Sequence, residues 1–362
     1  MNLKKHLITL YSLIKIYLFQ ILLILLGILI FSCEKDNTIE IIPDEPTVKL
    51  LFVANEGNYG DDNGSISVIN EEGVINTIEN VGDVVQSLLV HNDNLFVIVN
   101  NSHKIKVFNI FEDGTLTLSK VIDTDNSSPR EMVVFENKLY FTNWNTKDVK
   151  SLDLSTLTID ELSMPIDGLP ESIVETEGEL FVGIMMNSDY SDASRVLRID
   201  PTTNIIKDEV EVGDGPTNLL IVDDVIYVAR TYYDENWNAF HGTSTIEDYI
   251  QREKYNYEEA PRINIQNYGG GTSCGGTVHS YSRKVYRSFE GGVAALNQDL
   301  TINESSKIGD YDKSNVYAVE TIGDRVYVGT YDGYVKILNE DNIEISSYEV
   351  GIFPGDFEVW EQ

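Results

Sequence analysis

One strand-like pattern recurs along the chain, and this repeat constrains the fold more than any other feature of the sequence. Each copy has turn residues, an apolar residue, an aromatic residue and further alternation, as in VKLLFVAN and GDRVYVGT. Consecutive aromatic residues of the pattern are separated by 44, 44, 41, 46, 59 and 41 residues. They are Phe52, Phe96, Tyr140, Phe181, Tyr227, Tyr286 and Tyr327. A period of this length indicates a repeat architecture.

Each copy predicts four strands, because a short apolar strand precedes the aromatic one and two more alternating strands follow it. Four strands at this period form one blade of a β-propeller. The first copy lacks its innermost strand, whereas the chain ends in GDFEVWEQ with no blade after it. We therefore expect Phe357–Gln362 to lie beside Phe52. The predicted fold class is all-β: a seven-bladed β-propeller, with the ring closed by the C-terminal strand pairing with the N-terminal strand. An open β-solenoid or a pair of sandwiches is the alternative.

The N-terminal segment predicts export from the cytoplasm. Lys4 and Lys5 precede a long apolar run and then Cys33, an order typical of a secretory signal. The residues around Cys33 resemble a bacterial lipobox, which implies a lipoprotein signal peptide at residues 1–32 and lipidation of Cys33. The alternative is an uncleaved transmembrane anchor, because the apolar run is close to membrane-spanning length.

The composition after Cys33 limits the location and the partners. Residues 33–47 are acidic and contain proline, so they predict a flexible tether, and residues 48–362 are the predicted propeller. Acidic residues after a lipidated Cys resemble the surface-export signal of Bacteroidetes lipoproteins, which implies the outer membrane and display at the cell surface. A periplasm-facing position is the alternative. Removal of three signal-peptide lysines takes the formal charge from −33 to −36, which argues against nucleic acid as a partner.

The loops predict which face of the propeller binds a ligand. Loops between blades, and those joining the second and third strands of a blade, share one face, here called the top face. The bottom hairpins are short turns, whereas the top loops are longer and combine aromatic rings with Asn, Ser and Gly. Ala229–Pro261 is read as one long top-face insertion, which accounts for the spacing of 59. Some of the rings are expected to pack this insertion against the ring of blades. The candidate ligand-binding residues are Asn55, Tyr59, Asn101, Arg130, Asn143, Trp144, Tyr190, Tyr232, Tyr233, Trp237, Phe289 and Tyr331.

Polar residues at the starts of the innermost strands are expected to rim the central channel. They are Gln86, Arg130, Glu171, Asn218 and Asn315. Arg130 either grips a phosphate or carboxylate of the ligand or pairs with Glu171. The seven recurring aromatic residues are expected in the core, packed against neighbouring sheets.

No motif demands catalysis, so the chain is predicted to be a binding protein without a cofactor. Tyr268–Gly276 is rich in glycine but lacks the ending of a phosphate loop, and it predicts a close backbone approach at the channel mouth. Cys274 and His279 are conceivable as a nucleophile or metal pair, without an evident third partner. Asp61–Asn63 and Asp189–Asp192 carry oxygen ligands suited to calcium, although turn chemistry accounts for both.

The repeats resemble those of the YncE-like seven-bladed propellers. The opening motif LFVANEGNYGDDNGSISVIN is similar to the start of the Bacteroidetes surface-lipoprotein propellers that capture cobalamin (vitamin B12). The matching residues are Asn55, Glu56, Gly57, Asn58 and Gly60. This resemblance implies a surface protein that captures a corrinoid and delivers it to a TonB-dependent outer-membrane transporter.

A corrin ring is broad, flat and edged with amides, so it suits a wide aromatic face better than a narrow pocket. Flat contact area is expected from Trp144, Tyr190, Tyr232 and Trp237, and contacts to amides and phosphate from Asn55, Asn101, Asn143 and Arg130. The alternatives are a propeller that binds a glycan, a siderophore or a protein, and an enzyme of the lactonase or lyase type.

Overall fold

The computed structural model describes residues 48–248, 261–270 and 276–362. Pro46–Gln362 forms one compact unit. The predicted signal peptide, the tether and the lipidation site Cys33 lie outside the described residues. No helix in the described part of the chain is long and apolar enough to cross a membrane.

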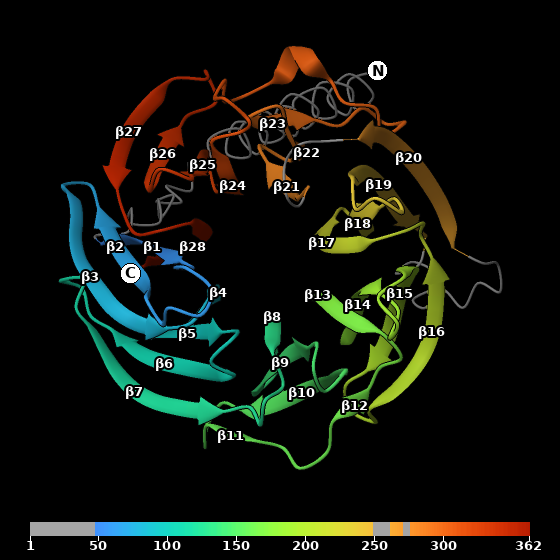
Figure 1. Cartoon of the computed structure of the whole chain (residues 1–362), viewed down its shortest axis with the longest axis horizontal. Helices are drawn as coiled ribbons and strands as arrows, with labels where there is room; N and C mark the ends of the chain where they lie inside the picture. Colours follow the sequence, from blue (N-terminus) through green and yellow to red (C-terminus); the bar gives the residue numbers. More distant parts are fainter. Residues whose placement is uncertain (1–47, 249–260, 271–275) are drawn as a thin grey trace, which may run out of the picture. The chain divides into compact units, whose positions relative to one another are not determined.

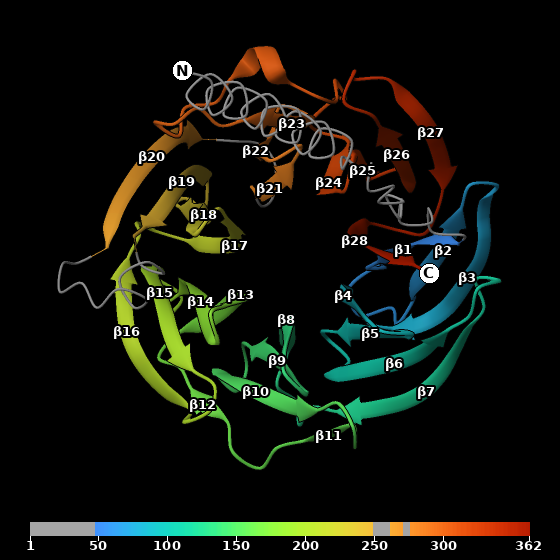
Figure 2. The same cartoon turned by 180° about the vertical axis from the view of Figure 1, so that it is seen from behind.

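Seven antiparallel sheets follow one another around a ring, as Figures 1 and 2 show from the two sides. Each sheet is one blade, and its strands are named from the innermost outward. Blade 1 is β28 (Pro354–Glu361), β1 (Lys49–Asn55), β2 (Gly64–Asn70) and β3 (Gly73–Gly82). Blade 2 is β4 (Val85–His91), β5 (Asn94–Val99), β6 (Lys104–Ile110) and β7 (Leu116–Asp123). Blade 3 is β8 (Pro129–Phe135), β9 (Lys138–Asn143) and β10 (Asp148–Asp153), with β11 (Thr158–Ile159) and β12 (Met164–Pro165) both paired to β10.

The remaining blades continue in chain order. Blade 4 is β13 (Leu169–Thr176), β14 (Glu179–Met186), β15 (Asp192–Asp200) and β16 (Ile205–Glu211). Blade 5 is β17 (Pro216–Val222), β18 (Val225–Tyr233), β19 (Ala239–Glu247) and β20 (Arg262–Gly270). Blade 6 is β21 (Val278–Tyr281), β22 (Lys284–Phe289) and β23 (Gly292–Ala295), followed by the 3-10 helix η1 (Glu304–Ser306). Blade 7 is β24 (Val316–Ile322), β25 (Arg325–Thr330), β26 (Tyr334–Leu338) and β27 (Glu344–Glu349). The predicted seven-bladed propeller is confirmed.

The ring closes as the sequence predicts. β1 pairs with β2 on one side and with β28 on the other, so that the two ends of the propeller share blade 1. Val53 lies opposite Phe357, and Phe52 lies opposite Glu358. Because of this pairing, the inner edge of β1 is covered by the last strand of the chain.

The core of the described residues consists of seven hydrophobic clusters, one between each pair of neighbouring blades. Six of the recurring aromatic residues are buried in them, and Tyr227 is half-buried. The smallest cluster, between blades 5 and 6, contains only Ala229, Val278 and Val285 as buried members among the described residues. Side chains that fill the core between sheets therefore explain the aromatic repeat.

Two buried arginines, Arg230 and Arg287, lie near this thin seam, where apolar side chains are few. Arg287 Nη1 donates to Thr243 Oγ1 over 3.1 Å, and its guanidinium lies 5.1 Å from the Tyr268 ring centre. A Cβ at Gly276 would overlap this guanidinium. Gly276, the last residue of the glycine-rich segment, thus lies against a buried side chain. Residues 271–275 lie outside the described residues, so the expected approach at the channel mouth stays a prediction.

Side chains of one blade bind the inner edge of the next. Asp356 of β28 accepts the backbone N–H of Leu88 over 2.6 Å, and Asn218 of β17 accepts that of Val278 over 3.0 Å. Innermost strands have no strand neighbour on the channel side, so these acceptors satisfy donors that would otherwise face the channel alone.

The prediction of a single top-face insertion at Ala229–Pro261 is wrong. β18 extends to Tyr233, a short turn follows, and β19 returns from Ala239 through the whole blade. Cross-strand pairs such as Tyr232 opposite Phe240 hold this longer hairpin together. The alternation in AFHGTSTIE marks a third strand, which the insertion interpretation missed.

Candidate functional site

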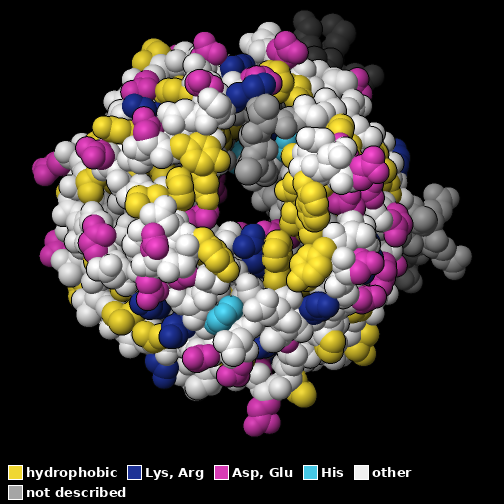
Figure 3. Space-filling view, viewed as in Figure 1, with side chains coloured by type: hydrophobic (Ala, Val, Ile, Leu, Met, Phe, Trp, Pro, Cys, Tyr) yellow, Lys and Arg dark blue, Asp and Glu magenta, His cyan; other side chains and the backbone are white. Residues whose placement is uncertain are grey.

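The top face carries the turns between β1 and β2, β14 and β15, β18 and β19, and β25 and β26. Figure 3 looks onto one face of the ring, which is hollowed at its centre, with hydrophobic side chains gathered around the hollow and acidic ones frequent farther out. The structure divides the candidate residues into buried positions, a cluster at the channel mouth and a cluster on blades 4 and 5.

Asn55 and Asn143 are fully buried, so the prediction that they contact a ligand is wrong. Asn55 Nδ2 donates to Ser65 Oγ over 3.2 Å and to Ser67 Oγ over 3.0 Å. Asn143 Nδ2 donates to the backbone carbonyls of Phe141 and Asp148. Both asparagines sit at the last position of a second strand, where they bond within their own blade instead of facing solvent.

Four aromatic residues from blades 1 and 7 line a cavity of about 500 Å³, here called the mouth cavity. Tyr317 packs against Phe353 at 5.3 Å and against Tyr331 at 5.1 Å between ring centres. Tyr59 is 79% exposed, which leaves its ring available to a ligand. Tyr59 and Tyr331 are thus brought together with Tyr317 and Phe353, two rings that the sequence analysis did not nominate.

Arg130 lines the polar side of the mouth cavity and is already bonded. Its Nε and Nη2 donate to the two Glu171 oxygens over 3.0 and 2.6 Å, and its Nη1 donates to Gln86 Oε1 over 2.8 Å. The guanidinium also lies 4.5 Å from the centre of the Trp144 ring. Of the two alternatives for Arg130, the structure contains the ion pair with Glu171.

Asn101 supports the loop that carries Tyr59. Its side-chain amide donates to Asp83, and Asp83 Oδ1 accepts the backbone N–H of Gly60 over 2.9 Å. Asn101 is half-buried in this arrangement. Through Asp83 it is linked to the β1–β2 loop.

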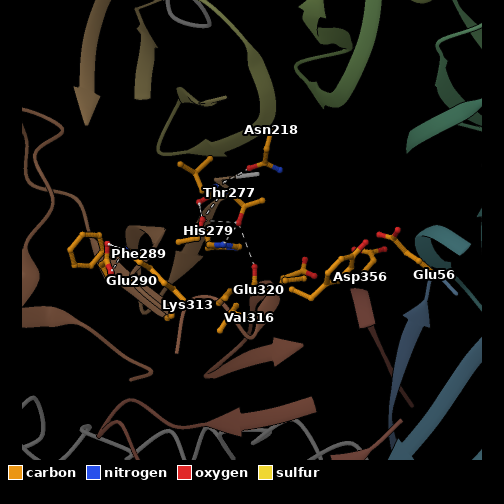
Figure 4. Close-up of a pocket in the computed structure, with 18 of the residues that line it drawn as sticks. Glu56, Asn218, Thr277, His279, Phe289, Glu290, Lys313, Val316, Glu320 and Asp356 are labelled. Atoms are coloured by element: carbon orange, nitrogen blue, oxygen red, sulfur yellow. Dashed lines mark hydrogen bonds and ion pairs between the residues drawn. The ribbon is translucent and has the colours of Figure 1, made fainter. Parts of the chain in front are cut away.

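A second cavity of about 500 Å³, here called the channel cavity, shares Glu56, Gln86, Arg130 and Tyr317 with the mouth cavity. Figure 4 shows Glu320, Asp356 and Glu56 following one another along its wall. Asn218, which was expected at the channel rim, also lines it. Phe289 is a lining residue too, and its role in ligand binding stays a prediction. Asn315 is not among its lining residues; its amide donates to Asp332 instead.

The channel cavity concentrates carboxyl groups that burial makes reluctant to ionise. Burial raises the pKa of Asp356 to about 7, although the Leu88 N–H opposes the shift. Burial also raises the pKa of Glu131 and Glu320, and the charge on Asp356 adds to both shifts. Glu56 shows the same direction of pKa shift from burial, offset in part by its hydrogen bond with Tyr317. Burial therefore shifts these four carboxyl groups toward their neutral, protonated forms.

The suggested metal and nucleophile sites gain no support from the geometry. Burial lowers the pKa of His279 to about 3, and its Nε2 lies 2.7 Å from Thr277 Oγ1. Cys274 lies outside the described residues. In the ranges that the structure describes, no group of three or more His, Cys, Asp or Glu is placed to hold a metal ion. Asp189 of one suggested calcium cluster accepts two hydrogen bonds from Ser191, as turn chemistry predicts.

The remaining aromatic candidates lie on blades 4 and 5, across the ring from blades 1 and 7 (Figure 1). Tyr190 is 64% and Trp237 is 67% exposed. Tyr233 packs against Trp237 at 5.9 Å, and Tyr232 stacks on Phe240 at 5.8 Å. The twelve candidates therefore do not form one continuous surface.

Sequence reasoning missed Tyr317, Phe353 and the channel carboxyl groups. Tyr317 and Phe353 lie near the loops between blades, which share the top face with the loops that were searched. Glu131, Glu320 and Asp356 sit in innermost strands, where a polar residue among apolar neighbours marks a position that faces the channel. Both signals are present in the sequence.

A family model described as a domain of unknown function, DUF5074, matches residues 49–233. This chain belongs to the DUF5074 family. The matched region of this DUF5074 protein runs from β1 to the end of β18, so it includes Tyr59 and Arg130 but not blades 6 and 7. A search of curated proteins gave no match.

Solved structures similar to this DUF5074 protein support the fold. A functionally unknown protein from Desulfotomaculum acetoxidans has 15% identity and a TM-score of 0.61, covering 86% of this chain and 99% of its own. Apo AztD from Citrobacter koseri has 11% identity and a TM-score of 0.57, covering 86% and 97%. Hydrazine synthase from Kuenenia stuttgartiensis has 12% identity and a TM-score of 0.57, covering 76% and 95%. Proteins with such different names share this architecture, so the fold alone does not assign a function.

Proposed function

We propose that this DUF5074 protein is a lipid-anchored propeller at the cell surface that captures a corrinoid and delivers it to a TonB-dependent outer-membrane transporter. The observation that carries the proposal is the mouth cavity, where four aromatic rings from blades 1 and 7 face polar side chains beside the channel. The role is binding without chemistry. The opening motif resembles that of cobalamin-capturing propellers, and Tyr59 lies within that motif.

We assign the binding role to residues around the mouth cavity. A corrinoid is larger than a cavity of about 500 Å³, so it would cover the channel mouth and insert only an edge. Tyr59 and Tyr331, 79% and 41% exposed, supply flat contact area on that edge. Gln86 and Arg130 face the same cavity and offer an amide and the remaining guanidinium N–H groups to corrin amides.

Calorimetric titration of the Pro46–Gln362 unit with cyanocobalamin tests the proposal. We expect saturable heat, and about tenfold weaker binding for Tyr59→Ala and Tyr331→Ala because each loses an aromatic contact. Phe111→Ala is the matched control, since Phe111 is 49% exposed in a bottom hairpin. The absence of saturable heat, or an equal loss in the control, would contradict the proposal.

A further inference from the structure

Two exposed aromatic residues on blades 4 and 5 occupy a backbone conformation that disfavours them. Tyr190 has φ 66° and Trp237 has φ 62°, both in the left-handed region. For a residue with a side chain this conformation costs about 1 kcal/mol or more. Neither ring offsets that cost by deep burial, because both are about two-thirds exposed.

The two residues hold the same place in two turns with the same hydrogen bonds. In the β14–β15 turn, Asn187 N donates to Ser191 O and Tyr190 N donates to Asn187 O. In the β18–β19 turn, Asp234 N donates to Asn238 O and Trp237 N donates to Asp234 O. This is a three-residue hairpin loop whose last position is left-handed, the place where glycine is usual.

Other turns with the same hydrogen bonds show what the backbone prefers. The β6–β7 turn has Gly114 at this position, and the β26–β27 turn has Asn342. A third turn, after β23, has Leu300, whose side chain is only 3% exposed and so gains from burial. Among these five turns in the described residues, only the two neighbouring top-face turns place an exposed ring there. Backbone strain that deep burial does not offset is common at ligand-binding sites, so it suggests that these two rings contact a ligand.

One hydrogen bond links the two hairpins that carry these turns. The Tyr233 backbone N–H donates to Asp192 Oδ2 over 3.4 Å, which joins the β18–β19 hairpin to β15. Tyr233 also packs against Trp237. We call Tyr190, on the β14–β15 turn, together with Tyr233 and Trp237, on the linked β18–β19 hairpin, the aromatic platform.

The polar groups beside the platform indicate which chemical class of ligand it can bind. Asp189 accepts two hydrogen bonds from Ser191, and these hold the pKa of its carboxyl below the usual value. Asp234 accepts from Asn238 and Asn236, with the same effect on its pKa. Neutral donors of their own turns therefore stabilise the ionised form of both carboxylates, which remain hydrogen-bond acceptors.

Such a surface complements a neutral ligand rich in hydroxyl donors. The adjacent cation, Arg195, donates to Asn187 Oδ1 and to the backbone carbonyl of Asp167, and the chain's formal charge of −33 repels anions. A sugar ring offers a flat C–H face to the aromatic rings and hydroxyl groups to the spare carboxylate lone pairs. We propose that the aromatic platform binds a neutral carbohydrate chain, at a site apart from the mouth cavity.

Native affinity electrophoresis of the Pro46–Gln362 unit in gels containing neutral polysaccharides tests this site. The panel would contain galactomannan, xyloglucan, mixed-linkage β-glucan and amylose. We expect at least one to retard the protein, with apparent affinity weakened more than about tenfold by Tyr190→Gly and by Trp237→Gly. Tyr59→Ala and Phe111→Ala should be retarded like the parent chain.

Glycine is chosen for these variants because it suits the left-handed position, so loss of binding should come with unchanged or higher thermal stability. The proposal is overturned if no neutral polysaccharide retards the chain, or if both glycine variants bind as the parent does. Salt-sensitive binding of poly-lysine that the glycine variants lose, without polysaccharide binding, would assign the platform to a basic protein instead. Trp237→Gly should bind a corrinoid as the parent chain does. A failure of the carbohydrate proposal can therefore be distinguished from a failure of the corrinoid proposal.

Discussion

The β6–β7 turn on the bottom face and the β18–β19 turn on the top face have the same hydrogen bonds and the same left-handed third residue. On the bottom face that residue is Gly114, which suits the backbone, whereas on the top face it is Trp237, which does not. Two of the three bottom turns of this type have Gly or Asn at the left-handed position, whereas two top turns place an exposed aromatic ring there. The difference is consistent with the proposal that the top face binds a ligand.

Leu300 is the bottom-face residue that occupies the left-handed turn position although it is neither Gly nor Asn. Leu300→Gly should have the largest effect on stability. The change loses the burial of a leucine side chain, about 2–3 kcal/mol, and recovers about 1 kcal/mol of backbone strain. We expect a net loss of about 1–2 kcal/mol in the free energy of unfolding, measured by chemical denaturation. A stabilised variant would mean that burial does not explain leucine at this position.

Gly114→Ala tests the β6–β7 turn, which has glycine at the left-handed position. The alanine would have to adopt the left-handed conformation that Gly114 has, at φ 80°. Its Cβ would also overlap the end of the Ile75 side chain. We expect a loss of about 1 kcal/mol or more in the free energy of unfolding, because the Ile75 side chain can move but the backbone cannot. Gly60→Ala, with a similar φ but open space around it, is the control that isolates the backbone cost. An unchanged stability for Gly114→Ala would remove the contrast between the two faces.

Asp356→Asn probes the channel cavity. The pKa of Asp356 is raised to about 7, so the folded chain binds this proton more tightly than the unfolded chain does. Its contribution to stability is full below about pH 4 and is lost as the pH rises through about 7. Asparagine can still accept the Leu88 N–H, so we expect the variant to be more stable than the parent at pH 8, by about 1 kcal/mol, with no such gain at about pH 4. Thermal denaturation across this pH range measures it, and a gain that does not depend on pH would contradict the assignment.

Trp237→Gly is expected to have the smallest effect on folding, a gain in stability. Relief of the left-handed strain outweighs the loss of the exposed contact with Tyr233, so the free energy of unfolding should rise by about 0.5 kcal/mol. Chemical denaturation of the variant beside the parent measures this. A clear loss of stability would show that the ring serves the fold.

The fold was predictable because a propeller repeats one burial pattern at a fixed period in the sequence. Seven aromatic positions between sheets indicated the number of blades, and GDFEVWEQ indicated the closure, since each pattern reflects burial against a neighbour. The prediction failed at Ala229–Pro261, where two extended strands with loop-like composition were taken for one loop.

The site was predictable only in part. Composition indicated the top face but could not separate Asn55, which is buried and bonds within its blade, from Tyr59, which is exposed. That distinction depends on whether the strand ends before or after the residue, and sequence patterns do not locate a strand end to within one residue. The mouth cavity also joins Tyr59 to Tyr317 and Phe353, residues more than 250 positions away in the sequence, and only ring closure brings them together.

Hydrogen–deuterium exchange of the Pro46–Gln362 unit, with and without cyanocobalamin, tests most directly that the channel mouth on the top face is the binding surface. We expect slower exchange in the β1–β2 loop around Tyr59 and in the segment around Phe353. The bottom hairpins at Phe111–Thr115 and Asn339–Ile343 should exchange at unchanged rates. Protection confined to the bottom hairpins, or no protection anywhere at saturating ligand, would contradict the account.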